Sequence, residues 1–182
     1  MDLIFPSLRI SRLTLRPLQL EDADVLHRIY QSKGVLRFFP DPIPPALEKV
    51  QRFILAQQAH WETHGYGNWG VLPDGSDEII GWAGLQYLPE RDETEVGFLL
   101  DRAFWGKGHA TEAAQASIKF GFDRFELDHI IALVHPDNLA SRRVIEKCGM
   151  TCIETIALWG IELNRFRVDN PLRVKNQWVN LV

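Results

Sequence analysis

The chain has 182 residues, of which 46% are hydrophobic and 24% are charged, and its formal net charge is −4. This length and composition are typical of a single globular domain, and the acidic balance excludes the basic footprint of a nucleic-acid-binding or membrane-surface protein. No apolar stretch approaches the roughly 20 residues of a membrane span, so we expect neither nucleic acid nor a membrane as a partner.

The N-terminal residues 1–6 have no basic segment followed by an apolar run, so we expect no signal peptide here. The chain has two cysteines, Cys148 and Cys152, and their spacing suits neither a disulfide framework nor a zinc site. We therefore predict one cytoplasmic domain over residues 1–182 with reduced thiols.

The first elements follow from apolar periodicity. Residues 8–17 alternate apolar and polar, which predicts an edge strand with a kink near Ser11. A helix should begin near Leu20 and bury Val25, Leu26, Ile29 and Tyr30. Residues 38–45 contain four prolines, which indicates an irregular connection. A second helix over residues 46–63 should bury Val50, Phe53, Ile54 and Trp61.

His60 and His64 stand four residues apart in this second helix, a spacing that can hold a metal ion. In a zincin motif a glutamate directly follows the first histidine, whereas Trp61 does so here, and no third ligand is evident. We predict no metal site and expect both histidines to face solvent or a cleft.

The middle of the chain has the pattern of an antiparallel meander. Residues 68–72 and 78–88 are expected strands joined by a strong turn at residues 73–76. A turn near residues 89–93 leads into a further strand that ends at Leu100. The acidic side chains of this turn, Glu90, Asp92 and Glu93, are predicted to lie on a solvated hairpin tip.

A glycine loop follows that strand. Gly106 and Gly108 precede a helix from about His109, which carries a stripe of small and apolar residues: Ala110, Ala113, Ala114, Ser117, Ile118, Gly121, Phe122 and Phe125. Unpaired N–H groups at a helix N-terminus and close backbone approach at glycine together favour a phosphate site. Neither a P-loop nor a dinucleotide fingerprint fits, because Asp101 and Thr111 stand where each needs glycine. A plain packing turn is the alternative for the loop taken alone.

The C-terminal third contains a second continuous apolar run at residues 129–134, so a strand-helix-strand unit with parallel pairing is expected. Asp137 or Asn138 should cap a helix through Lys147 that ends at Gly149 and buries Val144, Ile145 and Cys148. Residues 151–168 should form a hairpin that turns at Trp159 and Gly160. No helix or strand is predicted for residues 171–182.

Two blocks carry a family resemblance. Residues 105–110 resemble the acyl-CoA loop of the GNAT acetyltransferases, Arg/Gln-x-x-Gly-x-Gly/Ala, with Gly108 and Ala110 matching and Trp105 in place of Arg or Gln. Trp-Gly-x-Gly is common in the subgroup of ribosomal-protein N-terminal (alanine) acetyltransferases. Residues 138–150 resemble the GNAT segment Asn-x-x-Ala/Ser, a helix, then Gly-Phe/Met. The opening of the chain, near residues 12–22, resembles the same subgroup more softly.

The resemblance implies a single-domain α/β fold whose mixed, mostly antiparallel sheet is splayed between its fourth and fifth strands, with helices on both faces. It also implies acetyl-CoA as cosubstrate and direct, sequential transfer to a primary amine, either a protein N-terminal amine or a small molecule. The residues implied to contact acetyl-CoA are Leu99, Leu100, Trp105, Gly106, Lys107, Gly108, His109, Ala110, Thr111, Asn138 and Ser141.

Three residues are implied in catalysis. Only a neutral amine attacks a thioester, so a base is needed, and Glu95 stands four residues before Leu99 at the family's spacing. A backbone N–H near Leu99 would stabilise the oxyanion. Ser141 would assist the departing thiolate, because Ile145 occupies the position of the family's tyrosine. A surface glutamate and a simple helix cap are the alternatives for Glu95 and Asn138. None of the residues implied to contact acetyl-CoA is a cysteine, so the sequence gives no support to an acetyl-enzyme.

Several points stay open at this stage. The chain could instead be a non-catalytic acyl-CoA-binding module, or an enzyme that uses a longer acyl donor. The acceptor could be a protein N-terminus, a small amine, an amino acid, a polyamine or an antibiotic, and the protein could be a monomer or a homodimer. Four tryptophans are candidates either for lining an acceptor cleft or for filling the core: Trp61, Trp69, Trp82 and Trp159.

Overall fold

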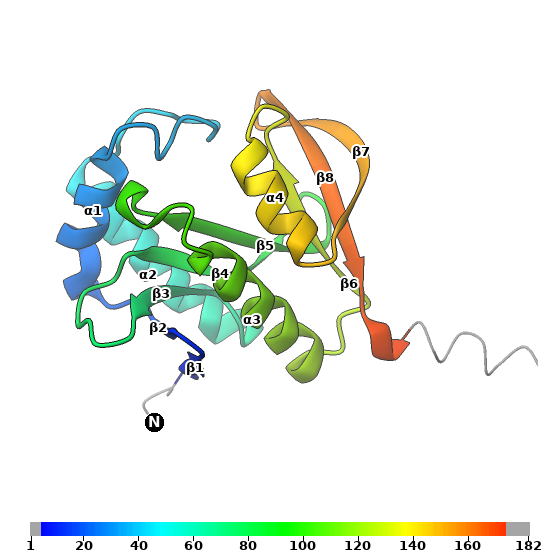
Figure 1. Cartoon of the computed structure of the whole chain (residues 1–182), viewed down its shortest axis with the longest axis horizontal. Coiled ribbons are helices and arrows are strands. Elements are labelled where there is room, and N and C mark those ends of the chain that lie inside the picture. The colour runs from blue at the N-terminus through cyan, green and yellow to red at the C-terminus, as the bar shows by residue number, and fades with distance from the viewer. Residues whose placement is uncertain (1–4, 174–182) are drawn as a thin grey trace, which may run out of the picture.

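The computed structural model describes residues 5–173, which form one eight-stranded sheet flanked by four α-helices (Figure 1). The strand order is β1-β2-β3-β4-β5-β6-β8-β7, and every neighbouring pair is antiparallel except β5 and β6. The strands are β1 Leu8–Ile10, β2 Leu13–Pro17, β3 Asn68–Pro73, β4 Gly81–Leu88, β5 Glu93–Leu100, β6 His129–Val134, β7 Thr151–Leu158 and β8 Ile161–Asp169. The α-helices are α1 Ala23–Gln31, α2 Leu47–His64, α3 His109–Arg124 and α4 Leu139–Lys147, and 3-10 turns occupy Leu20–Asp22 and Arg102–Phe104. The predicted mixed, mostly antiparallel α/β fold is confirmed.

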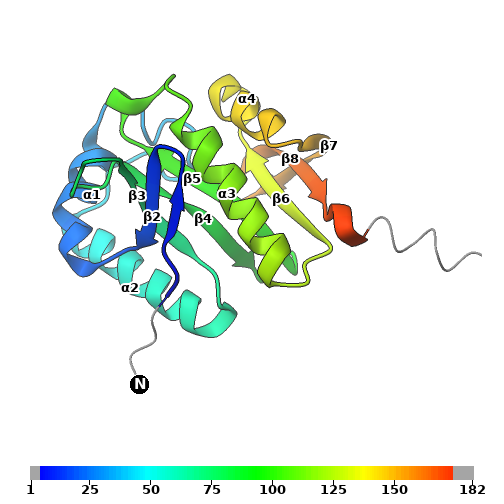
Figure 2. The same ribbon diagram turned by 60° about the horizontal axis from the view of Figure 1, so that its bottom comes forward.

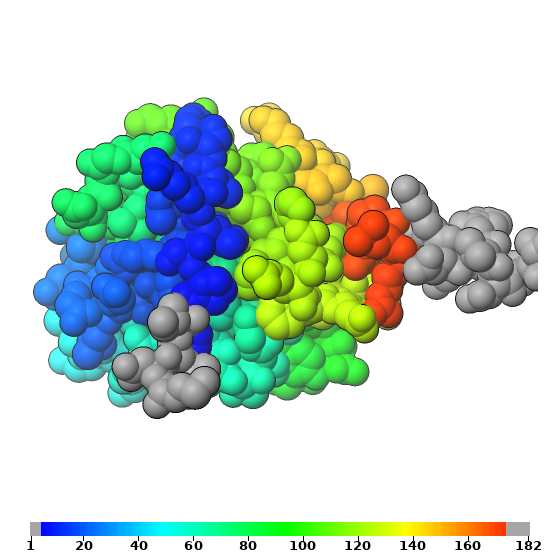
Figure 3. All heavy atoms as spheres, turned by 90° about the horizontal axis from the view of Figure 1, so that it is seen from below, coloured from blue at the N-terminus to red at the C-terminus, as the bar shows by residue number. Residues whose placement is uncertain are grey.

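Helices cover both faces of the sheet, as predicted (Figure 2). The small residues Ala113, Ala114 and Ser117 let α3 pack closely on β4 and β5, and they are fully buried there. Leu26, Val50 and Ile54 from α1 and α2 form a second apolar cluster on the opposite face. Figure 3 shows β1 and β2 running along the side of α3. None of the described helices has the length and apolar character to cross a membrane.

Two expected strands are corrected. Residues 8–17 form a tight hairpin, β1 and β2, in which Leu8 pairs with Leu15, so the interruption near Ser11 is a turn and not a kink. The three-residue step from Ile10 to Leu13 was the signal, because it breaks the alternation of a single strand. The strand expected from residue 78 begins at Gly81.

The sheet opens between β5 and β6. These parallel strands are registered through one pair, Glu95 with Ile131, and Figure 1 shows the two ribbons diverging from there. Counting residues 8–17 as one strand, this is the predicted splay between the fourth and fifth strands.

His60 is fixed in α2 by two backbone groups. Its Nε2 atom accepts a hydrogen bond from the Tyr87 N–H at 3.0 Å, and its Nδ1 atom lies 2.8 Å from the Tyr66 carbonyl oxygen, to which it donates. Neither nitrogen is left for a metal ion. The ring is therefore held neutral, and burial lowers its pKa.

This arrangement predicts acid sensitivity. Because the folded His60 has a lowered pKa, its contribution to stability is present above about pH 6.5 and is lost as the pH falls. His60→Gln should lower the melting temperature by a few degrees at pH 7.5, the effect of about 1 kcal/mol. It should also flatten the fall in melting temperature between pH 7.5 and 5.5. Scanning calorimetry with His64→Gln as control checks this, and an unchanged pH dependence in His60→Gln would contradict it.

Candidate active site

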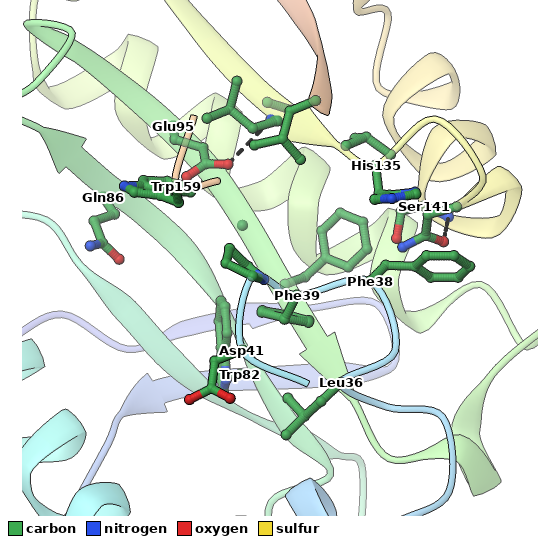
Figure 4. A pocket seen from close by; sticks show the side chains of 18 of the residues that line it. Leu36, Phe38, Phe39, Asp41, Trp82, Gln86, Glu95, His135, Ser141 and Trp159 are labelled. Carbon is green, nitrogen blue, oxygen red and sulfur yellow. Dashed lines mark hydrogen bonds between the residues drawn. The ribbon is translucent and has the colours of Figure 1, made fainter. Parts of the chain in front are cut away.

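A cavity of about 420 Å³ occupies the gap between β5 and β6 (Figure 4). One part of its wall consists of β5, β6 and the start of α4, and another consists of the connection between α1 and α2. Residues that line it from the first part include Glu95, Val96, Gly97, Phe98, Ala132, Leu133, Val134, His135, Asn138 and Ser141. Of the residues implied to contact acetyl-CoA, Asn138 and Ser141 line this cavity, whereas Leu99, Leu100 and residues 105–111 lie outside its lining.

Glu95 lies where the two strands part. Its carboxylate accepts a hydrogen bond from the Leu133 N–H at 3.2 Å, a donor that a continuous parallel ladder would have directed to the β5 backbone. Burial raises the pKa of Glu95 to about 7, against the opposing effect of this hydrogen bond. Glu95 is therefore a cavity residue, and the alternative of a plain surface glutamate is set aside.

The pairing of β4 and β5 decides which amides face the gap. On β4 the Leu85 N–H bonds Gly67 on the β3 side and the Tyr87 N–H bonds His60 on that same side. Since backbone direction alternates along a strand, the even-numbered residues of β4 face β5. Their partners Gly97 and Leu99 consequently face β4.

The predicted N–H donor near Leu99 is therefore corrected. The amide of Leu99 points to β4, and its side chain is buried against α1 and α2. Phe98 and Leu100 are the β5 residues whose amides face the gap. The Leu100 carbonyl accepts a hydrogen bond from the Trp105 indole N–H at 2.8 Å, which closes the glycine loop onto the end of β5.

The glycine loop has the open backbone that the sequence predicted. Gly106 and Gly108 adopt positive φ angles of 73° and 86°, and residues 105–108 are exposed. The first hydrogen bond of α3 is made by the Glu112 N–H to the Gly108 carbonyl, so the amides of His109, Ala110 and Thr111 precede it and have no acceptor within the helix. The ring of His109 packs beside Phe104, with centroids 6.1 Å apart.

Arg12, in the β1–β2 turn, donates hydrogen bonds to the glycine loop and to the start of α3. This role was not predicted from the sequence. The Nη2 atom of Arg12 donates to the Lys107 carbonyl at 3.2 Å, and its Nε donates to the Glu112 carboxylate at 3.1 Å. The pairing offsets the negative charge of Glu112 at the N-terminus of α3, where a phosphate would lie. Arg12 precedes Lys107 by 95 residues, so no local pattern could reveal the contact.

Asn138 caps α4, because its Oδ1 accepts a hydrogen bond from the Ser141 N–H at 3.1 Å. Both residues also line the cavity. His135 lies beside them and was also missed. The Asp137 N–H donates to its Nδ1 at 3.2 Å, so a neutral His135 carries its proton on Nε2. The only indication of His135 in the sequence was its position, as a titratable residue directly after a predicted buried strand.

The sequence model of the Acetyltransferase (GNAT) domain family matches residues 12–151. The chain belongs to this family. It is 34% identical to the uncharacterized N-acetyltransferase p20 of Bacillus licheniformis over 142 residues, 76% of this chain and 79% of that protein. It is 29% identical to the FsC-acetyl coenzyme A-N(2)-transacetylase of Aspergillus fumigatus, over 82% of this chain and 67% of that protein.

The resemblance to the ribosomal-protein subgroup is supported at the level of fold. The structure of RimL, a ribosomal L7/L12 alpha-N-protein acetyltransferase in complex with coenzyme A, superposes with a TM-score of 0.76 at 18% identity, over 90% of this chain and 98% of that one. The protein is accordingly an acyltransferase with the GNAT fold, and acetyl-CoA is the cosubstrate that its family implies.

The glycine loop generates a matched pair of variants. Gly108→Val places a branched side chain at a positive φ beside Arg12, where even a Cβ would lie 3.3 Å from Nη2, and covers the open amides. Gly75→Val imposes the same kind of strain, roughly 1–3 kcal/mol, in a β3–β4 turn with nothing within 4 Å. We expect similar losses of melting temperature but at least tenfold weaker coenzyme A binding by calorimetry in Gly108→Val alone. Retained affinity in folded Gly108→Val would contradict the loop assignment.

Proposed function

We propose that this GNAT protein transfers the acetyl group of acetyl-CoA directly to a primary amine. The observation that carries the proposal is the position of Glu95, whose carboxylate lies in the cavity between the strands that are expected to hold the thioester. The cavity continues past Glu95 to the connection between α1 and α2, which leaves room for an acceptor on the far side of the base.

The donor site is proposed from backbone groups. The amides of residues 106–111 would bind the pyrophosphate of acetyl-CoA, because residues 106–108 are exposed, residues 109–111 are partly exposed, and all of them lie at the positive end of α3. The gap-facing amides of Phe98 and Leu100 replace that of Leu99 as the predicted oxyanion donors, a kind of contribution worth about 3 kcal/mol. Ser141 is retained as the group that hydrogen-bonds or protonates the thiolate, together with the cap residue Asn138.

Glu95 is proposed as the general base. An α-amine or lysine amine arrives mainly protonated at neutral pH, since its pKa is about 8 or 10. A carboxylate whose pKa is about 7 accepts a proton near neutral pH far more readily than an ordinary glutamate does. Its hydrogen bond to Leu133 fixes one side of the carboxylate, so the proton can be received, directly or through water, on the side that faces the cavity.

Glu95→Gln tests this role without removing the contact to Leu133, because the amide oxygen of glutamine can still accept that hydrogen bond. The variant should lower kcat by about a hundredfold or more at neutral pH, and it should abolish the rise in kcat/KM that is centred near pH 7 in the wild type. Thiol release from acetyl-CoA over a pH series measures both. Coenzyme A affinity should be unchanged by calorimetry.

The same assay separates the enzyme from a non-catalytic acyl-CoA-binding module. Tight coenzyme A binding without thiol release for any amine would favour the module. Unchanged turnover in Glu95→Gln would remove Glu95 from the mechanism while leaving the donor site intact.

A further inference from the structure

The part of the cavity beyond Glu95 is lined mainly by aromatic and other apolar side chains and by few charges, and this lining restricts which amines can bind there as acceptor. Resting on the function proposed above, we infer that the acceptor is a primary amine carried on an apolar body with no second charge. The structure supports this through the aromatic side chains that line the cavity, the pairing of its charges and the backbone of Trp159.

Aromatic rings reach this part of the cavity from separate elements. Phe39 belongs to the connection between α1 and α2, Trp82 to β4 and Trp159 to the β7–β8 turn, and all three line the cavity (Figure 4). Trp82 lies against Gly97, since a Cβ there would meet its ring at 3.3 Å. Its indole N–H donates to the Tyr30 hydroxyl at 3.0 Å, so Trp82 offers the cavity an apolar ring with its donor already satisfied.

The charges that line the cavity leave one carboxylate for the amine. Among the described lining residues the charged side chains are Asp41, Lys49 and Glu95. Asp41 is paired with Lys49 at 3.0 Å and also accepts a hydrogen bond from the Ile43 N–H at 3.2 Å. Asp41 and Lys49 are both more than half exposed, so this pair lies in solvent at the edge of the cavity. Away from that edge, a second ammonium on the acceptor would lose water without meeting a carboxylate other than Glu95, and contact with an aromatic face returns only part of that cost.

Trp159 occupies a backbone position that its side chain does not favour. Leu158 pairs with Ile161, and the two residues between them, Trp159 and Gly160, have φ angles of 52° and 81°. A two-residue hairpin turn with positive φ at both positions favours Asn-Gly, and a bulky residue there indicates either strain or function. Here the side chain lines the cavity beside Glu95 (Figure 4), and the residue is 45% exposed, so apolar surface is available to a ligand.

The acceptor class is tested with a matched pair of amines, hexylamine and 1,6-diaminohexane, which have equal length and differ by one ammonium. We expect kcat/KM from thiol release to be at least tenfold higher for hexylamine, with the acetylated product confirmed by mass spectrometry. Equal or reversed preference would overturn the inference while leaving the acetyltransferase function standing. A free 2-phenylethylamine and a short peptide with N-terminal phenylalanine then distinguish a small molecule from a protein terminus as the source of the amine.

Binding provides a readout that does not depend on turnover. With coenzyme A bound, calorimetry should show at least tenfold tighter binding of hexylamine than of the diamine. This measurement decides the inference even if neither amine is acetylated, and failure of both amines to bind would overturn it.

Trp159→Asn separates a ligand contact from a structural role. Asparagine suits the turn, so the melting temperature should stay the same or rise, and coenzyme A affinity should not change. KM for hexylamine should rise at least fivefold with kcat largely retained.

A second variant, Phe39→Glu, adds a carboxylate to the cavity. It should lower the ratio of kcat/KM for hexylamine to kcat/KM for the diamine. An unchanged KM in Trp159→Asn together with an unchanged preference in Phe39→Glu would contradict the assignment.

Discussion

The hydrogen bond from the Leu133 N–H to the Glu95 carboxylate allows the sheet to open at its centre. Parallel strands that separate leave backbone donors without partners, and an unsatisfied buried donor costs about 1–3 kcal/mol. Glu95 is the last β5 residue in register with β6, and its side chain supplies the acceptor that the diverging backbone no longer provides. The residue that ends the ladder is thus also the carboxylate in the resulting cavity, so the opening and the chemistry proposed for it share one side chain.

Where β5 and β6 remain together, a second carboxylate, that of Glu93, is surrounded by cationic side chains, in contrast with the carboxylate of Glu95. The sequence had suggested that Glu93 lies on a solvated hairpin tip, but its side chain is only 10% exposed and contacts Arg165, Arg91 and His129. Burial alone would raise the pKa of Glu93, yet these partners outweigh it and hold the value at about 2. Glu93 consequently stays ionised and ties β5 to β6 and β8, while Glu95, two residues along the same strand, has its pKa raised to about 7.

The sequence predicted what local periodicity and local backbone chemistry determine. The alternation of apolar residues located most strands, the small-residue stripe located α3, and Gly106 and Gly108 located the exposed loop. Interactions that depend on strand register or on segments distant in the chain could not be predicted from the sequence. The direction of the Leu99 amide depends on which residues of β3 and β4 pair. Arg12 reaches Lys107 only once β1 and β2 lie beside α3, and Glu93 meets Arg165 only because β8 inserts next to β6. Of the four tryptophans considered, Trp61 and Trp69 are core, whereas Trp82 and Trp159 line the cavity.

Alternation along β5 would let one short strand serve both of the proposed substrates. The side chains of Glu95 and Leu99 point to the face covered by α1 and α2, where the aromatic part of the cavity lies, whereas those of Val96 and Leu100 pack on the face of α3. The amides of Phe98 and Leu100 lie between these two faces, in the plane of the sheet, and point toward the gap. A thioester held along that edge would present its carbonyl to an amine beside Glu95 without crossing the sheet. Donor and acceptor can therefore meet in a single ternary complex, which is the geometry that direct transfer requires and that a covalent acetyl-enzyme would not need.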